Sequence, residues 1–143
     1  MPLYAVLLVM PVFAQQASDT RAATIPATGA CENATVTNIA YYFQDDPQSG
    51  FVVEYSSQLG LGTKEYEGEH RFASIVDRET PPNPVIAREH PGDHVRICLT
   101  QFPQKDDRCD PSKDWRGRVY TVYDYRLHEK YSGANANHLC GGA

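Results

Sequence analysis

Hydrophobic and polar residues alternate with a period of two along three stretches of the chain. These stretches are 51–56 (FVVEYS), 94–99 (HVRICL) and 119–126 (VYTVYDYR). Their hydrophobic positions are mostly β-branched or aromatic, and such side chains pack well on one face of a pleated strand while the alternate positions face water. The pattern therefore predicts three half-buried β-strands.

Three further segments favour strands by residue type. Residues 65–76 and the segment from Lys130 toward Cys140 are predicted strands. Residues 34–43 (ATVTNIAYYF) also favour a strand, although Thr35 or Thr37 could instead cap a short helix. Turn-forming residues separate the predicted strands, at 45–50, 81–84, 91–93 and 109–114. We therefore expect an all-β fold, a small antiparallel sandwich or barrel of about six strands.

The first 30 residues differ in composition from the rest of the chain. Residues 3–13 (LYAVLLVMPVF) carry no charge and are followed by the small residue Ala14, so residues 1–14 are predicted to be a signal peptide. No Lys or Arg precedes this run, and a short buried helix is the alternative. Residues 15–30 are small and polar, which predicts a flexible leader. Residues 31–143 are predicted to form a single β-domain in the periplasm or outside the cell.

The four cysteines all lie in the predicted β-domain. An even number in an exported protein predicts two disulfides. Of the three possible connectivities we favour Cys98 with Cys109, which closes a hairpin-sized loop, and Cys31 with Cys140, which ties the start of the domain to its end. A zinc site would need close pairs such as Cys-x2-Cys, and the sequence has none, so we predict no metal.

Size and charge exclude several classes of protein. The chain has 143 residues, which is one domain, and its 13 Lys+Arg against 18 Asp+Glu give a net charge of −5. Its basic residues are scattered, so we expect no DNA partner. No later apolar run approaches the roughly 20 residues of a membrane span. The sequence has neither a Walker loop nor a Gly-x-Ser-x-Gly motif, and we expect no cofactor.

Tyrosine is abundant, with nine in the chain. Trp115, Tyr123 and Tyr125 lie in or just before the most tyrosine-rich predicted strand. Tyrosine combines contact area with a polar tip, so these residues are candidates for a surface that stacks on sugars or holds a protein, the alternative being plain packing. We therefore expect a non-catalytic binding or structural domain whose partner is an envelope protein, a hydrolase or a glycan.

The last third of the chain resembles the C-terminal half of small exported bacterial proteins that have no assigned activity. The resemblance rests on 92–99 (GDHVRICL), Cys109, 116–120 (RGRVY) and 138–143 (HLCGGA). It implies a disulfide between Cys98 and Cys109 and export from a Gram-negative cell. It implies no function.

Three scattered residues give a second resemblance, to the secreted microbial ribonucleases specific for guanine. Glu67 in Tyr66-Glu67-Gly68, Arg96 and His128 correspond to that family's strand Glu, strand Arg and late His. The resemblance implies Glu67 as general base, Arg96 stabilising the phosphorane charge and His128 as general acid. The family's Tyr-Pro-His motif and a clear N-terminal helix are absent. A small secreted endoribonuclease is therefore the alternative function.

Overall fold

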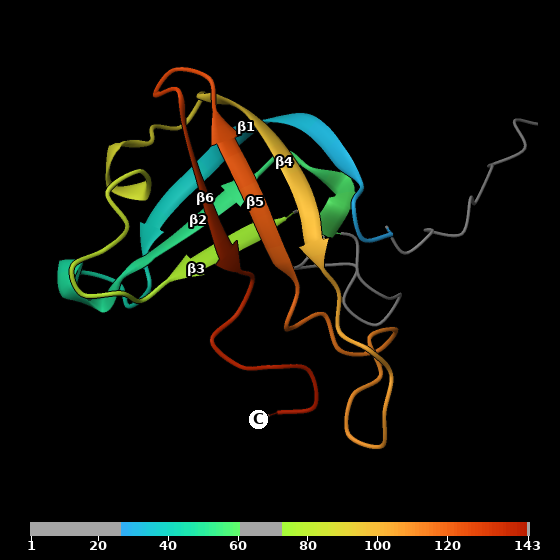
Figure 1. Ribbon diagram of the computed structural model, residues 1–143. Helices are drawn as coiled ribbons and strands as arrows, with labels where there is room; N and C mark the ends of the chain where they lie inside the picture. The colour runs from blue at the N-terminus through green and yellow to red at the C-terminus, as the bar shows by residue number, and fades with distance from the viewer. Residues whose placement is uncertain (1–26, 61–72, 143) are drawn as a thin grey trace, which may run out of the picture.

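The computed structural model describes residues 27–60 and 73–142, which form one curled antiparallel sheet (Figure 1). Six strands lie in the order β3-β2-β1-β4-β5-β6, and the described residues contain no α-helix. The sheet is a half-barrel, which confirms the all-β, disulfide-bonded fold. The strands are β1 (Cys31–Tyr41), β2 (Phe51–Tyr55), β3 (Ser74–Asp77), β4 (His94–Gln101), β5 (Val119–Asp124) and β6 (Glu129–Ala134).

The strands agree with the predicted ones except at their ends. Residues 34–41 form a strand and no helix, but β1 begins earlier than predicted, at Cys31, and ends at Tyr41, two residues before the predicted end. Backbone contact to β4 continues before Cys31, because the Gly29 amide donates to the Leu99 carbonyl at 2.7 Å. The last strand stops at Ala134, and Asn135 begins a loop that leads to Cys140. The predicted signal peptide, most of the predicted leader and residues 65–72 of the predicted strand 65–76 lie outside the described residues.

The core fills the concave side of the sheet. The period-two pattern turns Val95, Ile97 and Leu99 of β4 inward, where each is fully buried, and leaves His94 and Arg96 on the convex side. Burial of a side chain of this size stabilises the fold by about 1.5–3 kcal/mol. The same alternation operates on the other strands, and the inward residues form one continuous cluster that includes Val36, Val53, Tyr55, Ile75, Tyr120, Val122 and Tyr131.

The two edges of the curled sheet approach each other at Gly133 of β6 and Ile75 of β3. A Cβ atom at position 133 would overlap Ile75 Cγ2, so only glycine allows this approach. β3 and β6 are not paired by ladder hydrogen bonds, since they are the two ends of the strand order. Side-chain packing, and not backbone pairing, therefore closes the interior here.

The predicted disulfide pairing was wrong, although all four cysteines are bonded. The bonds are Cys31–Cys98 and Cys109–Cys140. Cys31 and Cys98 face each other directly on β1 and β4, with their Cα atoms 4.0 Å apart. These strands are neighbours in the sheet but far apart in sequence, and loop length alone did not reveal their pairing. Cys109 lies in the loop that leaves β4, which carries it away from Cys98 and against the C-terminal segment.

Candidate functional site

A row of polar and aromatic residues crosses the convex side of the sheet over four strands. Asn33 on β1 pairs with Arg96 on β4, Arg96 with Tyr123 on β5, and Tyr123 with Lys130 on β6. Directly paired residues on neighbouring strands point to the same side of a sheet. We call this row, together with the adjacent His94 and Tyr125, the tyrosine face.

Tyr123 and Tyr125 of the tyrosine face form an aromatic pair. Their ring centroids are 5.3 Å apart and their planes meet at 78°, the favoured edge-to-face arrangement. Tyr125 is 44% exposed, and its hydroxyl donates a hydrogen bond of 3.2 Å to Asn33 Oδ1. Because β4 lies between β5 and β1, this side chain reaches across a whole strand. The pair is thus oriented, and it remains accessible to a ligand.

The charge of the tyrosine face is opposite to that of the whole protein. Arg96 and Lys130 are exposed on either side of Tyr123, and within the described chain neither makes an ion pair. The carboxylates next to Lys130 and Tyr123 in the chain do not face these cations: Glu129 binds Arg88 at 2.7 Å, and Asp124 is buried on the concave side. A protein with a net charge of −5 therefore carries a locally positive, tyrosine-bearing surface.

No carboxylate enters the three rows of described residues that make up this part of the convex side. Those rows, read across the strands by register, are Cys31, Cys98, Thr121 and Ser132; Asn33, Arg96, Tyr123 and Lys130; and Thr35, His94 and Tyr125.

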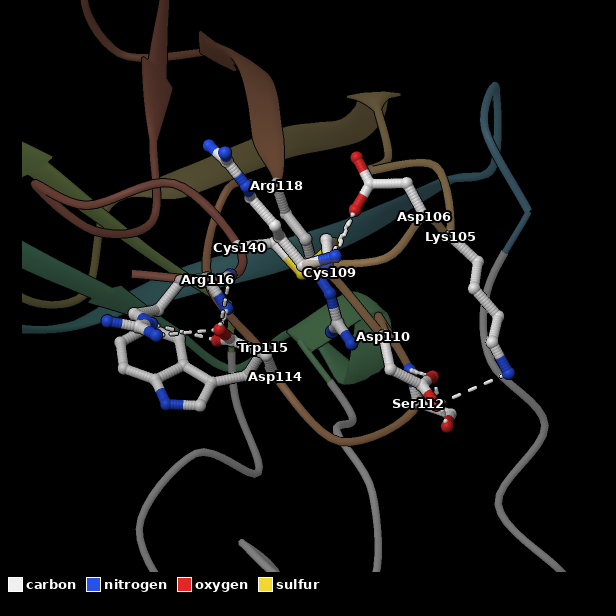
Figure 2. The surroundings of a disulfide bond; sticks show 12 residues. Lys105, Asp106, Cys109, Asp110, Ser112, Asp114, Trp115, Arg116, Arg118 and Cys140 are labelled. Atoms are coloured by element: carbon white, nitrogen blue, oxygen red, sulfur yellow. Dashed lines mark hydrogen bonds and ion pairs between the residues drawn. A yellow bond between two sulfur atoms is a disulfide. The ribbon is translucent and has the colours of Figure 1, made fainter. Parts of the chain in front are cut away.

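Trp115, predicted to share a surface with the two tyrosines, lies elsewhere. It belongs to the loop between β4 and β5, beside the Cys109–Cys140 disulfide (Figure 2). Tyr125 follows the opposite end of β5. The structure thus brings Tyr123 and Tyr125 together and leaves Trp115 separate.

Trp115 borders a shallow hollow of about 570 Å³ in this loop, and charged side chains form the rest of its lining, namely Arg108, Asp110, Lys113, Asp114 and Arg116. Asp114 accepts two hydrogen bonds from the Arg116 guanidinium, at 2.8 and 2.7 Å, one of 3.1 Å from the Arg116 amide and one of 2.9 Å from the Gly141 amide. The Arg116 hydrogen bonds hold the pKa of Asp114 well below its usual range. Asp110 is held by Ser112 and Lys105. These carboxylates are therefore occupied by contacts within the loop and with the C-terminal segment, several of which Figure 2 draws as dashed lines.

The residues of the ribonuclease resemblance are not seen together. Glu67 lies outside the described residues. Arg96 is in the middle of β4, within the tyrosine face, whereas His128 is exposed in the turn between β5 and β6 with a positive φ of 55°. The described residues thus give this constellation no common cleft.

Sequence reasoning missed a buried chain of polar groups inside the half-barrel. The Tyr131 hydroxyl donates to Glu89 Oε2 at 2.7 Å, so the hydrogen bond between Tyr55 and Tyr131 uses the proton of Tyr55. Glu89 is 4% exposed, and burial raises its pKa to about 7, with a further upward contribution from the Asp124 carboxylate. No motif around Glu89 signals this environment, because the contacts come from strands distant in sequence.

A second aromatic surface was also missed. It lies at the tip of the β1–β2 hairpin, where the Arg78 guanidinium sits 4.8 Å from the Tyr42 ring centroid and 5.6 Å from that of Phe43. Tyr41 stacks on Phe51 with centroids 5.6 Å apart. We call these five residues the hairpin cluster. The run Tyr41-Tyr42-Phe43 was the available signal, but it reads equally well as the end of a buried strand.

Comparison with known proteins gives no relative. No protein family matches the sequence, and no curated protein or solved structure is significantly similar to it. Among residues 27–60 and 73–142, no group of three His, Cys, Asp or Glu side chains could hold a metal ion. The same residues form no helix long and apolar enough to cross a membrane.

Proposed function

We propose that this protein is an exported domain that acts by binding, and that the tyrosine face is its binding surface. One observation carries the proposal: the exposed Tyr125, the half-buried Tyr123 and two exposed cations share the convex side of the sheet, with no carboxylate in the same rows. Exposed aromatic and arginine side chains are typical of residues that dominate binding energy at interfaces. Two disulfides are compatible with a periplasmic or secreted location.

Binding explains the arrangement better than catalysis does. General acid–base catalysis needs an acid and a base that converge on one reacting group, one of them with a pKa near the working pH. Glu89 has such a pKa, but it is enclosed by Tyr55 and Tyr131 in the core and has no access to a substrate. The ribonuclease reading remains an alternative that no contact among the described residues favours.

Site-specific photo-crosslinking in the native cell tests this proposal. A photoreactive benzoylphenylalanine replaces Tyr123 in one variant and Tyr42 of the hairpin cluster in the other, so that both variants carry the probe at a half-buried aromatic position. We expect a covalent adduct from position 123 that is lost when Arg96→Gln and Lys130→Gln are added, and no such charge-dependent adduct from position 42. Adducts of equal yield from both positions, or none from position 123, would contradict the proposal.

Protein isolated from the native cell also tests the proposed export. The intact mass of the extracytoplasmic protein should correspond to a chain cleaved after Ala14, and each disulfide should add two alkylated thiols after reduction. A protein recovered only from the cytoplasm, or with alkylatable thiols before reduction, would contradict an exported binding domain.

A further inference from the structure

We infer that the ligand of the tyrosine face is an acidic polysaccharide whose chain lies across the strands. This inference rests on the proposed binding function and adds the chemical class of the ligand. Three properties of the face support it: the spacing of its charges, the absence of aliphatic side chains and the sign of its charge.

The spacing of the row matches a chain of sugar rings. Arg96, Tyr123 and Lys130 lie on consecutive strands β4, β5 and β6 in direct register. Neighbouring strands are about 4.8 Å apart, so the two cations are separated by about 10 Å along the row, with Tyr123 midway. Each pyranose ring lengthens a polysaccharide by a distance similar to the spacing between neighbouring strands. A ring that stacks on Tyr123 would therefore place the acidic groups of its neighbours near Arg96 and Lys130.

Each side chain in the row supplies a contact that an acidic sugar uses. A tyrosine ring packs on the C–H face of a pyranose and leaves its hydroxyl for hydrogen bonding. Arg96 can bind a carboxylate or sulfate with two parallel hydrogen bonds, and Lys130 can bind one as a point charge. Asn33 continues the row onto β1, and its side-chain amide can donate to a sugar hydroxyl while its Oδ1 accepts from Tyr125.

The chemistry of the face distinguishes this ligand from a folded protein. A stable protein interface has an apolar centre of large side chains, surrounded by a polar rim. The three rows of the convex side contain only cysteine, threonine, serine, asparagine, histidine, arginine, lysine and tyrosine. No leucine, isoleucine, valine or methionine provides an anchor there. A polar ligand with hydroxyls and acidic groups fits this surface better.

Charge also argues against the remaining candidates. A neutral glycan would leave Arg96 and Lys130 unpaired. A nucleic acid is bound mainly through many phosphate contacts, and two cations on a protein of net charge −5 provide few of them. An acidic polysaccharide offers C–H ring faces and negative charges together, which complement the tyrosines and the two cations of the face.

Isothermal titration calorimetry with the exported, oxidised protein tests the inference. The probe is a polygalacturonate oligosaccharide at low ionic strength, with dextran of similar length as neutral control, polyaspartate as acidic peptide control and polyuridylate as nucleic acid control. We expect binding to polygalacturonate that weakens with salt, no binding to dextran, and weaker binding to polyaspartate and polyuridylate. Equal affinity for all three polyanions would show that charge alone is recognised, and would overturn the inference.

Variants locate the site. Tyr123→Ala, and the double variant Arg96→Gln/Lys130→Gln, should each weaken polygalacturonate binding at least about tenfold, which is about 1.4 kcal/mol. The matched charge control Arg108→Gln/Lys113→Gln, in the hollow beside Trp115, should leave the affinity unchanged, and circular dichroism confirms that each variant folds. Loss of binding in the hollow variant instead would overturn the assignment.

The failure of this inference can be told apart from the failure of the proposed function. If polygalacturonate does not bind but the charge-dependent photo-adduct from position 123 forms, the ligand is not an acidic polysaccharide while the tyrosine face is still a binding surface. If both are absent, the proposed function fails as well.

Discussion

The carboxylate of Glu89 accepts a hydrogen bond of 2.7 Å from the hydroxyl of Tyr131 in the interior of the half-barrel. Glu89 Oε1 and Asp124 Oδ2 are also buried, and neither has a hydrogen-bond partner among the described residues. A buried carboxylate without full hydrogen bonding is costly, and the cost falls when it takes up a proton, because a neutral group is much less costly to bury than a charged one. The core therefore contains a group whose protonation is coupled to folding.

This coupling predicts that stability falls as pH rises toward neutrality. The unfolded chain releases the Glu89 proton near the ordinary pKa of 4.5, and the folded protein releases it near 7. Between these values the folded state binds more protons, so the stabilisation is complete below pH 4.5 and is lost as pH rises through 7. The free energy of unfolding should fall by about 3 kcal/mol across this range. Urea titrations across this range measure it.

Glu89→Gln tests the assignment of this pH dependence to one group. Glutamine keeps an oxygen acceptor for Tyr131 and carries no charge at any pH. We expect the variant to lose most of the pH dependence between 4.5 and 7 and to be more stable than the native chain at pH 8. A native slope in the variant would show that another group is responsible. Asp93 is not that group, because its hydrogen bonds with Arg126 lower its pKa, so its contribution is lost only in more acidic solution.

Gly133→Ala should open the contact between the two edges of the sheet. The new methyl group overlaps Ile75 Cγ2, and relief of the overlap requires a shift of β3 or β6. We expect a loss of about 1–3 kcal/mol in the free energy of unfolding, as for other overpacked cores. The same substitution in an Ile75→Ala background should cost less, because the atoms it meets are gone. Additive effects in this double-mutant cycle would argue against direct contact.

Removal of either disulfide should destabilise the protein by a similar amount. The bonds close segments of 67 and 31 residues, and in the chain-entropy model each loss corresponds to about 4 kcal/mol. The paired substitutions Cys31→Ala/Cys98→Ala and Cys109→Ala/Cys140→Ala measure this by urea denaturation. Peptide mapping of the oxidised native chain supplies the control, and a peptide that links Cys98 to Cys109 would contradict the structure.

An RNA cleavage assay distinguishes the proposed binding domain from the ribonuclease alternative. We expect purified protein to leave single-stranded RNA intact, because Arg96 lies within β4 whereas His128 lies in the turn between β5 and β6, and the described residues give them no shared cleft. If cleavage occurs and Glu67→Gln abolishes it, the ribonuclease alternative is supported and Arg96 acts on phosphate. Cleavage that persists in Glu67→Gln points to a contaminating nuclease and leaves the expectation of no activity standing.

The sequence predicted well which residues of one strand share a face, and it predicted poorly which strands lie next to each other in the sheet. The period of two in 119–126 predicted that Tyr123 and Tyr125 share one face, and they do. The same local pattern predicted the buried face of β4. Such patterns depend only on the backbone geometry of a single strand, and so they can be recognised without knowing the rest of the fold.

Relationships between strands could not be predicted in this way. The adjacency of β1 and β4 determines both the Cys31–Cys98 bond and the approach of Asn33 to Arg96. The sequence of either strand contains no pattern that identifies the other as its neighbour. Trp115 was grouped with the tyrosines because it is near them in sequence, but a strand of six residues separates it from Tyr125 in space. The surroundings of Glu89 depend on the same long-range pairing.

The Cys31–Cys98 bond lies two positions from Asn33 on one strand and two positions from Arg96 on the other. It therefore fixes the register of β1 against β4 immediately beside the row that is proposed to hold the ligand. Preorganisation of this kind reduces the conformational entropy that is lost on association. Even a few weak contacts along an extended polymer could then suffice for retention, because the receptor is already in its bound geometry before the polymer arrives.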